Sequence, residues 1–324
     1  MKTLLIIFSL ILIFNQKVVF SQDLDFDSWL FELKTEARKQ GISDDLLERA
    51  FLDVKPIERI LELDKKQPEF TLTLEKYLKN VVTKKRVVRG RYLLSSNKNL
   101  LKKIEEKFHV PGNLIIALWG IETNFGKHTG SFSVISALTT LAFDGRRSAF
   151  FRKELINALK ILNAGHVELA KMKGSWAGAM GQCQFMPSTF MQYAIDYNGD
   201  GKKDLWGSKE DALASAANYL TKMGWDSRLN WGREVLAPNN FSIEKNMVIE
   251  QTLKEWSSVG FKNLDKTSIP SSEIKVKLLA LDSEKGGKRF FLIYNNFNVI
   301  LKWNRSNFFA IAVGKLSDKI QYVE

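Results

Sequence analysis

The sequence predicts a mainly helical protein that carries a small β-sheet near its C-terminus. Apolar residues in the first third recur at helical spacing, as at Trp29 and Leu33, which is typical of amphipathic helices. Residues 114–121 are almost wholly apolar, and a helix of that composition must be buried. From about residue 273 the pattern changes to two short β-like runs, 274–281 and 290–293, which predict the small sheet.

The first residues have the layout of a secretory signal peptide. Lys2 precedes an apolar run at 4–14, and Ser21 offers a small residue for cleavage, so we expect a signal peptide over residues 1–21 and export to the periplasm. The run is shorter than the roughly 20 residues that a spanning helix needs, although a retained anchor is the alternative. The only cysteine, Cys183, lies far from the cleavage point, which argues against a lipoprotein anchor and excludes an internal disulfide.

Capping and breaking residues delimit the helices that follow. Ser43 can cap the second helix, Pro68 interrupts the stretch after it, and a further helical segment is expected over residues 74–94. Pro111 suits the first turn of the buried helix. The last apolar run, 308–313, fits either a strand or a helix.

The charge of the chain favours an acidic partner. Its 324 residues have a formal net charge of +12, and loss of Lys2 and Lys17 with the signal peptide leaves +10. Such a chain attracts acidic partners, although the same side chains can form an ordinary solvated surface. We find no zinc spacing, RNA-binding signature or Gly-rich phosphate loop that indicates nucleic acid. Peptidoglycan, whose stem peptides carry carboxylates, fits both the charge and the expected compartment.

Glu122 is an ionisable residue at the end of the buried helix, just before residues 123–126, Thr-Asn-Phe-Gly. Burial favours the neutral form of a carboxylic acid. A protonated acid can donate its proton to a leaving glycosidic oxygen. The alternative is an ordinary glutamate at a helix end, solvated or paired with Lys127.

A second cluster, residues 174–187, combines Gly, Ala and Ser with aromatic side chains. Small residues let the backbone approach a ligand closely. Ser175 and Gln184 add hydrogen-bonding groups, and aromatic rings suit the apolar faces of sugars. Tight packing around the glycines is the alternative interpretation.

Together the two clusters resemble the lytic murein transglycosylases of the membrane-bound B type, whose catalytic domain is similar to goose-type lysozyme. The motifs that carry the resemblance are GIETNFG at 120–126, FDGRR at 143–147 and the run 174–188 with its GAMG and QFMP cores. Segments 63–70, 77–90 and 216–219 extend the resemblance almost end to end.

The helical pattern and the resemblance together predict five segments. They are a signal peptide at 1–21, an N-terminal helical region at 22–110, a lysozyme-like catalytic core at 111–232, a small α+β subdomain at 233–300, and a C-terminal segment at 301–324 that returns to the cleft.

Carried over residue by residue, the resemblance makes Glu122 the catalytic residue and places Ser175 and Gln184 beside the sugar. The positions that correspond to further substrate contacts are Tyr77, Arg146, Arg147, Tyr219 and Asn304. Trp303 and Phe309 stand where some relatives have aromatic hydroxyls, and Cys183 occupies a variable position where we expect packing.

The motifs supply one carboxylate, whereas a usual glycosidase needs two. Asp144 is the nearest second candidate, but Arg146 and Arg147 beside it suggest a solvated turn that binds anions. The resemblance implies that Glu122 protonates the leaving oxygen while the N-acetyl group of muramic acid stabilises the oxocarbenium-like centre. The same carboxylate then deprotonates the C6 hydroxyl, which closes a 1,6-anhydro ring without water or a cofactor.

Two other functions remain open at this point. One is a lysozyme-type hydrolase on the same scaffold, and the other is a noncatalytic peptidoglycan-binding protein. Besides the glycan strands, proteins of cell-wall synthesis or remodelling are candidate partners.

Residues 196–204 begin like an EF-hand calcium loop, with oxygen ligands at positions 1, 3 and 5 and Gly201 at position 6. Position 12 is Gly207, so the usual closing Glu is missing. The resemblance implies a longer loop whose ligands are Asp196, Asn198, Asp200, the carbonyl of Lys202, and Asp211. The alternative is an Asx-rich turn without an ion; calcium, if bound, would be structural.

Overall fold

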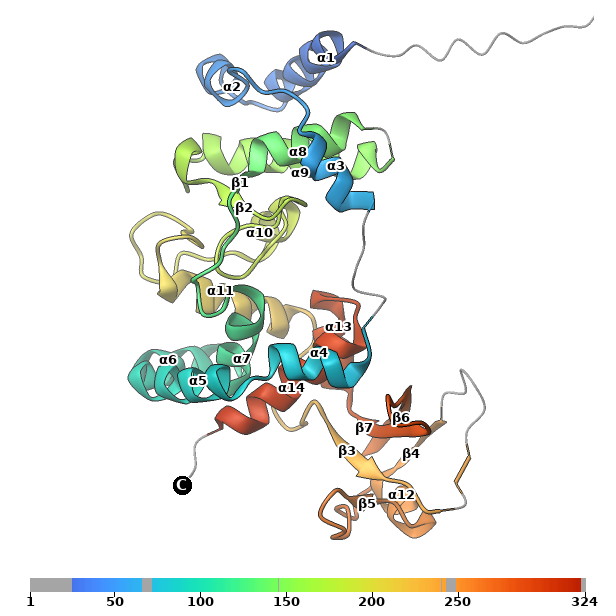
Figure 1. Cartoon of the computed structure of the whole chain (residues 1–324). Helices are drawn as coiled ribbons and strands as arrows, with labels where there is room; N and C mark the ends of the chain where they lie inside the picture. The colour runs from blue at the N-terminus through green and yellow to red at the C-terminus, as the bar shows by residue number, and fades with distance from the viewer. Residues whose placement is uncertain (1–24, 66–71, 145, 240, 243–248, 322–324) are drawn as a thin grey trace, which may run out of the picture.

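The structure is a computed structural model that describes residues 25–65, 72–144, 146–239, 241–242 and 249–321. The predicted signal peptide at 1–21 and the predicted break at Pro68 lie outside these residues. Helices dominate the described chain, and a small antiparallel sheet precedes the last two helices (Figure 1), so the predicted fold class is confirmed. In these ranges no helix combines the length and the apolar character needed to cross a bilayer.

At one end of the molecule, the first three helices lie beside elements from residues 132–193 (Figure 1). Its elements are α1 (Phe26–Lys39), α2 (Asp44–Ala50), α3 (Glu58–Lys65), β1 (Phe132–Ser133), α8 (Val134–Phe143), α9 (Ser148–Asn163), η2 (Leu169–Lys171), β2 (Lys173–Gly174) and α10 (Pro187–Tyr193). Helices α3 and α9 pack on α8, and α10 packs on α9. The Ser43 hydroxyl accepts the N–H of Leu46, which confirms the predicted cap of α2.

The rest of the helical body surrounds α7 (Gly112–Thr123). The other helices of this part are α4 (Leu74–Val81), α5 (Lys84–Ser96), α6 (Lys98–Phe108), α11 (Lys209–Lys222), α13 (Asn295–Trp303) and α14 (Asn307–Ile320), and α4 and α13 pack on α14. Because α5, α6, α11 and α14 all pack on α7, its residues 114–120 are buried. The apolar run therefore forms the buried helix that the sequence predicted.

Some predicted element boundaries were wrong. Residues 74–94 fall in two helices, because Thr83 is the N-cap of α5 and its hydroxyl accepts the N–H of Arg86 at 3.1 Å. An N-cap threonine satisfies a backbone donor that a helix start leaves free. Pro111 is the N-cap of α7 rather than its first helical residue. The ambiguous run 308–313 lies within helix α14.

The sheet has five antiparallel strands in the order β4-β6-β7-β3-β5. They are β3 (Gly232–Leu236), β4 (Ile249–Thr252), β5 (Lys262–Asn263), β6 (Lys275–Asp282) and β7 (Lys288–Ile293), with α12 (Leu253–Val259) after β4. The two β-like runs lie in strands β6 and β7, which form a hairpin, so the predicted small sheet is confirmed. Trp256 and Phe261 belong to a second apolar core on this sheet, separate from that of the helices.

An ion-pair network joins the sheet to the helical body. Glu234 on β3 accepts hydrogen bonds from Arg289 on β7, at 2.7 Å, and from Lys315 on α14. Arg289 also lies 3.5 Å from the carboxylate of Glu75 on α4. These four side chains are largely shielded from solvent, so the network links the sheet to both helices.

Candidate active site

Glu122 lies in the last turn of α7 and is half-buried, whereas the helix before it is buried. The chain then turns sharply, because Asn124, Phe125 and Gly126 all have positive φ, at 51°, 62° and 77°. The Phe125 ring folds back onto Gly120, where an added Cβ would lie 2.7 Å from a ring carbon. Glycine at 120 therefore allows the turn that presents Glu122.

Trp303, at the end of α13, holds the Glu122 carboxylate. Its indole N–H donates to Glu122 Oε1 at 2.8 Å. The Trp303 ring packs against the rings of Tyr219, at 5.1 Å, and Phe185, at 5.2 Å. The C-terminal part of the chain thus contacts Glu122 directly, through a residue that the sequence analysis had noted only as a departure.

Tyr219 supports this contact from behind. Its hydroxyl donates to the backbone carbonyl of Lys302 at 2.7 Å. Burial, with a smaller effect of Tyr193, raises the pKa of Tyr219 to about 12, so the phenol stays protonated and can remain a donor. Tyr219 is therefore placed to fix the end of α13, one residue before Trp303.

Cys183 is buried close to Glu122. Its thiol donates to the carbonyl of Ala212 at 2.9 Å. Burial first, and the charge of Glu122 second, raise the pKa of the Cys183 thiol. A thiol that is buried and neutral is a weak nucleophile, which supports packing as the role expected of Cys183.

The turn after Glu122 is tied to the glycine-rich segment through Thr123 and Gln182. The Thr123 hydroxyl donates to the backbone carbonyl of Gln182 at 2.9 Å and accepts the N–H of Gly126 at 3.0 Å. The indole N–H of Trp119 donates to Gln182 Oε1 at 3.0 Å. Thr123 and Gln182 were not among the predicted site residues, although both lie within the motifs at 120–126 and 174–188 that carry the resemblance.

The side chains of Ser175 and Gln184 hydrogen-bond to backbone groups of the glycine-rich loop and, for Gln184, also of the loop after α7. Ser175 Oγ accepts the N–H groups of Ala177 and Ala179, at 3.3 and 3.0 Å. Gln184 Nε2 donates to the carbonyls of Thr129 and Gly181, both at 3.0 Å. The Ser175 hydroxyl retains its proton for donation, and the Gln184 amide oxygen can accept a hydrogen bond. The loop therefore fixes both side chains while each keeps a polar group for a ligand.

Arg146 and Arg147 share a carboxylate that the sequence analysis did not single out. Both guanidinium groups hydrogen-bond to Asp64, at the end of α3, and Arg146 also donates to the Asp64 carbonyl at 2.8 Å. The Asp64 side chain is only 2% exposed, whereas those of the arginines are 49% and 43% exposed. The arginines of the expected solvated turn are thus half-exposed, and the anion that they bind in the structure is Asp64 of the protein itself.

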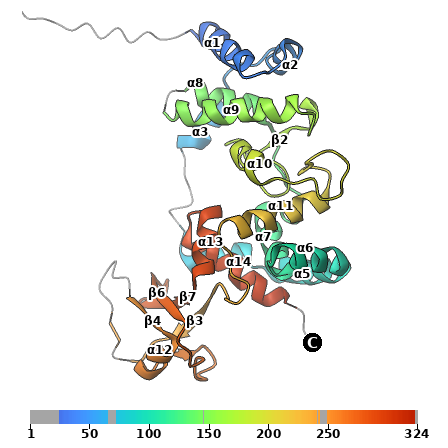
Figure 2. The same cartoon turned by 180° about the vertical axis from the view of Figure 1, so that it is seen from behind.

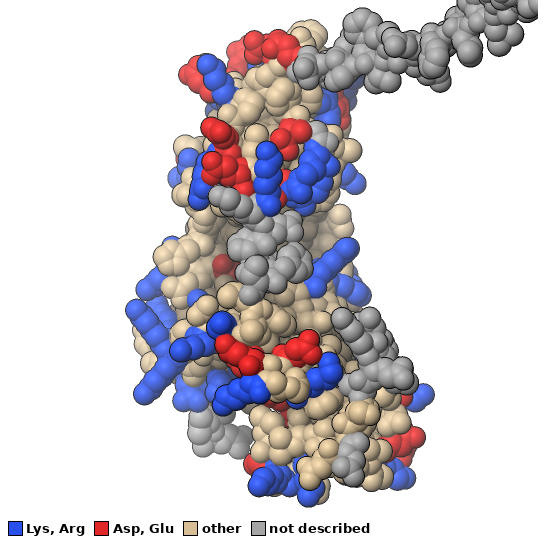
Figure 3. Space-filling view, turned by 45° about the vertical axis from the view of Figure 1, so that its right-hand side comes forward, with Lys and Arg blue, Asp and Glu red and all other residues tan. Residues whose placement is uncertain are grey.

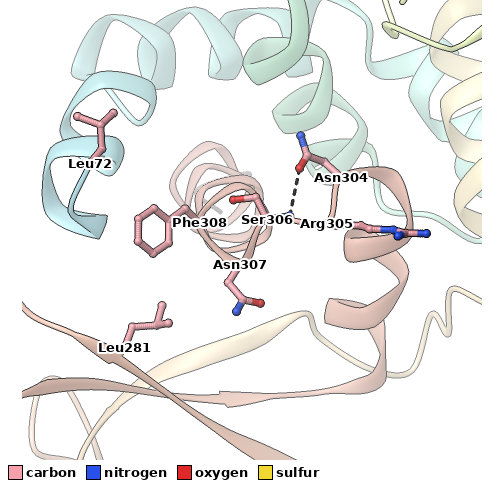
Figure 4. Close-up of a pocket in the computed structure, with 7 residues that line it drawn as sticks. All are labelled: Leu72, Leu281, Asn304, Arg305, Ser306, Asn307 and Phe308. Atoms are coloured by element: carbon pink, nitrogen blue, oxygen red, sulfur yellow. Dashed lines mark hydrogen bonds between the residues drawn. The ribbon is translucent and has the colours of Figure 1, made fainter. Parts of the chain in front are cut away.

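Tyr77 on α4 and Asn304 both lie near the turn between α13 and α14. The Tyr77 ring is 5.9 Å from that of Phe308. Asn304 borders a cavity of about 400 Å³, where its side chain accepts the N–H of Ser306 at 3.1 Å (Figure 4). Leu72, Leu281 and Phe308 supply an apolar side of this cavity. Asn304, which lines this cavity, directly follows Trp303, the residue that hydrogen-bonds to Glu122.

The acidic loop has a suitable donor set for a cation. Carboxylate oxygens of Asp196, Asp200 and Asp211 lie within 4.8 Å of one another. Burial is the largest influence on Asp211 and raises its pKa, with a further increase from the charge of Asp196. A group of carboxylates that repel one another, with one of them buried, fits a hard cation such as calcium.

The remaining predicted ligands lie in the same loop. Asn198 Oδ1 accepts the N–H of Asp200, and the N–H of Lys202 donates to Asp200 Oδ1. Asp211 Oδ1 accepts the N–H groups of Tyr197 and Asn198, so α11 already closes the loop. These bonds support the longer loop that the resemblance implies.

The fold matches enzymes of known structure. SltB3 from Pseudomonas aeruginosa, solved in complex with NAG-anhNAM-pentapeptide, aligns with a TM-score of 0.86 at 40% identity, over 92% of this chain and 80% of that one. Escherichia coli Slt35 in complex with calcium aligns with a TM-score of 0.76 at 27% identity, over 89% of this chain and 90% of that one. The fold class is therefore that of the lysozyme-like lytic transglycosylases.

Sequence comparison identifies the family. Residues 25–318 match the family described as Transglycosylase SLT domain, and the chain belongs to that enzyme family. Membrane-bound lytic murein transglycosylase B of Escherichia coli strain K12 is 30% identical over 251 residues, which cover 76% of this chain and 66% of that protein. The resemblance that the motifs indicated is confirmed.

Proposed function

We propose that this protein is a peptidoglycan lytic transglycosylase that cleaves the β-1,4 bond between N-acetylmuramic acid and N-acetylglucosamine. The observation that carries the proposal is Glu122, whose carboxylate lies in the last turn of a buried helix and accepts a hydrogen bond from the indole of Trp303. The relative named SltB3 has been solved with a muropeptide that contains the anhydro sugar.

In the proposed reaction, Glu122 acts first as an acid and then as a base. As an acid it protonates the glycosidic oxygen, while the substrate's own N-acetyl group stabilises the oxocarbenium-like centre. As a carboxylate it then takes the proton of the C6 hydroxyl, and the oxygen closes the 1,6-anhydro ring on C1. Because one residue serves both steps, the reaction needs no second carboxylate and no cofactor.

Trp303 contributes to this cycle as a positioning residue. An indole N–H can only donate a hydrogen bond, so it stabilises the carboxylate form of Glu122 that the second step uses. Its ring is held by Tyr219 and Phe185, which fixes the direction of the N–H. Tyr219, which the resemblance placed among the substrate contacts, is instead assigned to positioning Trp303 through the Lys302 carbonyl, because its side chain is buried and its hydroxyl is bonded there.

We assign the remaining predicted contacts from the polar groups of each side chain that are still accessible to a ligand. We assign Ser175 and Gln184 to the N-acetyl group, because each keeps one hydrogen-bonding group while the loop holds the other. Arg146 and Arg147 are assigned to substrate through their half-exposed guanidinium groups, which Asp64 orients.

Tyr77 and Asn304 are assigned to a more distant part of the glycan, beside the cavity at residues 304–308. We further propose that the lysozyme-like core spans residues 111–232 and the α+β subdomain 233–300, whose last residues belong to α13 and pack with the helices, and that residues 301–324 return to the cleft. Export to the periplasm through a signal peptide at 1–21 is part of the same proposal.

The acidic loop is assigned a structural calcium ion. Asp196, Asn198, Asp200, the Lys202 carbonyl and Asp211 would hold it, and the relative Slt35 has been solved in complex with calcium. The ion would neutralise the clustered carboxylates and fasten the loop to α11. The proposed reaction takes place at Glu122 and on the substrate's own groups, and the ion takes no part in it.

The direct test of the proposed role of Glu122 is Glu122→Gln. The amide keeps the shape and can still accept the Trp303 hydrogen bond, but it cannot transfer the proton, so glycan cleavage should fall by about 10²- to 10⁴-fold or more. Folding and glycan binding should be nearly unchanged. Glu154→Gln is the matched control, because Glu154 is buried in α9 and accepts the N–H of Ser188. Wild-type turnover by Glu122→Gln would refute the assignment.

A further inference from the structure

The positive charge of the chain is concentrated in one stretch. Residues 76–107 contain eleven Lys and Arg and two Glu, a net charge of +9 out of +12 for the whole chain. This stretch comprises all of α5 and most of α4 and α6. Helices α5 and α6 lie side by side at one edge of the molecule in both views (Figures 1 and 2), and basic side chains gather there on the surface (Figure 3).

The exposed face of α5 has apolar side chains between basic ones. Val88 and Tyr92 are 59% and 60% exposed, far more than other large apolar residues of this helix. At about 3.6 residues per turn, these two occupy the middle of the exposed arc. Lys84 lies on one side of them, and Lys85 and Arg89 lie on the other. The opposite face, with Leu93 and Leu94, is buried in the protein.

Protein carboxylates do not neutralise this face. In the described ranges, the ion pairs of residues 76–107 are those of Lys76 with Glu284 and of Lys102 with Glu106. The Arg89 guanidinium instead lies over the ring of Tyr92, 5.0 Å from its centroid. Exposed apolar residues within a basic surrounding are the composition of a docking surface.

The combination fits one class of partner better than another. An amphipathic helix that lies in a bilayer interface presents aromatic and aliphatic residues flanked by Lys and Arg. A glycan strand with carboxylate-bearing peptides could use the cations and Tyr92, but it gives no reason for an exposed Val88. The aliphatic side chain and the phenol both suit the headgroup boundary of a membrane.

We propose that the exposed face of α5, with the lysines of α6 beside it, docks the protein on an anionic phospholipid surface. Val88 and Tyr92 enter the headgroup region, and Lys84, Lys85 and Arg89 contact the lipid phosphates. This surface consists of residues outside the Glu122 site, so the protein can hold a membrane and a glycan strand at once. The proposal does not depend on the chemistry proposed for Glu122.

The test is cosedimentation of the exported protein with two kinds of vesicle, at about 0.15 M ionic strength, where the Debye length is about 8 Å. One kind contains phosphatidylethanolamine and phosphatidylglycerol, and the other only phosphatidylcholine. The wild type should bind the anionic vesicles and hardly bind the neutral ones. Each Lys or Arg near an anionic surface is worth about fivefold in binding, so Lys85→Glu with Arg89→Glu should weaken it by at least about 25-fold.

The matched control is Lys262→Glu with Lys275→Glu, which changes net charge equally at exposed positions on the sheet. This control should retain most of the vesicle binding. Val88→Ser with Tyr92→Ser, which leaves the net charge unchanged, should lower the affinity for anionic vesicles several-fold. Circular dichroism checks folding, and Lys85→Ala with Arg89→Ala replaces the reversal if that pair does not fold.

Three outcomes would overturn the proposal. In the first, reversal on α5 leaves anionic-vesicle binding unchanged. In the second, the control pair loses as much binding as the α5 pair, which would assign binding to net charge alone. In the third, the wild type ignores vesicles but binds insoluble peptidoglycan through the same α5 residues, which would assign this face to the cell-wall polymer.

Discussion

Replacing Trp303 by Phe should shift the pH dependence of cleavage. The substitution keeps a ring against Tyr219 and Phe185 but removes the N–H that donates to Glu122 at 2.8 Å. Hydrogen bonds to charged groups contribute about 1.5–3 kcal/mol. Because Glu122 is only half-buried, we take the lower end of that range.

That loss destabilises the carboxylate relative to the protonated acid. A difference of about 1.4 kcal/mol corresponds to one pH unit, so Glu122 should keep its proton to a pH about one unit higher. The alkaline limb of the profile of kcat/KM against pH should therefore move up by about one unit. Trp303→Tyr, whose hydroxyl can also donate, should keep the limb nearer to the wild-type position.

The assay is release of soluble muropeptides from purified glycan strands, measured across pH per folded molecule. Trp231→Phe is the matched control, because its indole also donates to a carboxylate, that of Asp318 at 3.1 Å. Trp231 lies by the start of α7, about 14 Å along the helix from Glu122. Trp231→Phe should lower the melting temperature without moving the alkaline limb of the pH profile. An unmoved limb in a folded Trp303→Phe protein, or one that moves to lower pH, would refute the reasoning.

Three further predictions concern the loops and the sheet. Calcium at about a hundredfold excess over its Kd should stabilise the fold by roughly 2.7 kcal/mol, which a higher melting temperature would show. Asp211→Asn should remove that stabilisation, and equal melting temperatures with calcium and with chelator would contradict the calcium site. Ser175→Ala and Gln184→Ala should each slow turnover far less than Glu122→Gln, since a neutral hydrogen bond contributes about 0.5–1.5 kcal/mol, whereas a pure packing role would lower melting temperature but not turnover. Burial alone would raise the pKa of Glu234, but hydrogen bonds from Arg289 and Lys315 hold it below its ordinary value. The network therefore stabilises the fold at neutral pH, and this stabilisation is lost as the pH falls through the lowered pKa. Arg289→Met should lower the melting temperature more at neutral than at acid pH, and an equal decrease at both would be inconsistent with the network.

The elements that follow from local pattern were predictable from the sequence. The apolar run at 114–121 became a buried helix, Ser43 became a cap, and the two β-like runs became a hairpin. Each of these depends on side chains a few residues apart, where periodicity and capping act. Thr83 belongs to the same class of signal, and reading it as a cap would have divided residues 74–94 correctly.

The contacts that shape the candidate site could not be predicted in this way. Trp303 meets Glu122 across 181 positions of sequence, and Arg146 meets Asp64 across 82. Such pairs depend on how helices pack, which hydrophobic periodicity does not specify. The resemblance indicated which residues to examine, but not that Asp64 would bind both arginines or that an indole would hold Glu122.

The central claim is that Glu122 cleaves glycan by internal ring closure, and the mass of the products tests it most directly. Purified glycan strands are digested by the wild-type protein, and the muramyl ends are analysed by mass spectrometry. Internal closure predicts ends that are lighter by one water than hydrolysed ends, with no oxygen taken from isotopically labelled water. Ends that carry the full mass and the solvent label would show that water is the acceptor, and would contradict the account.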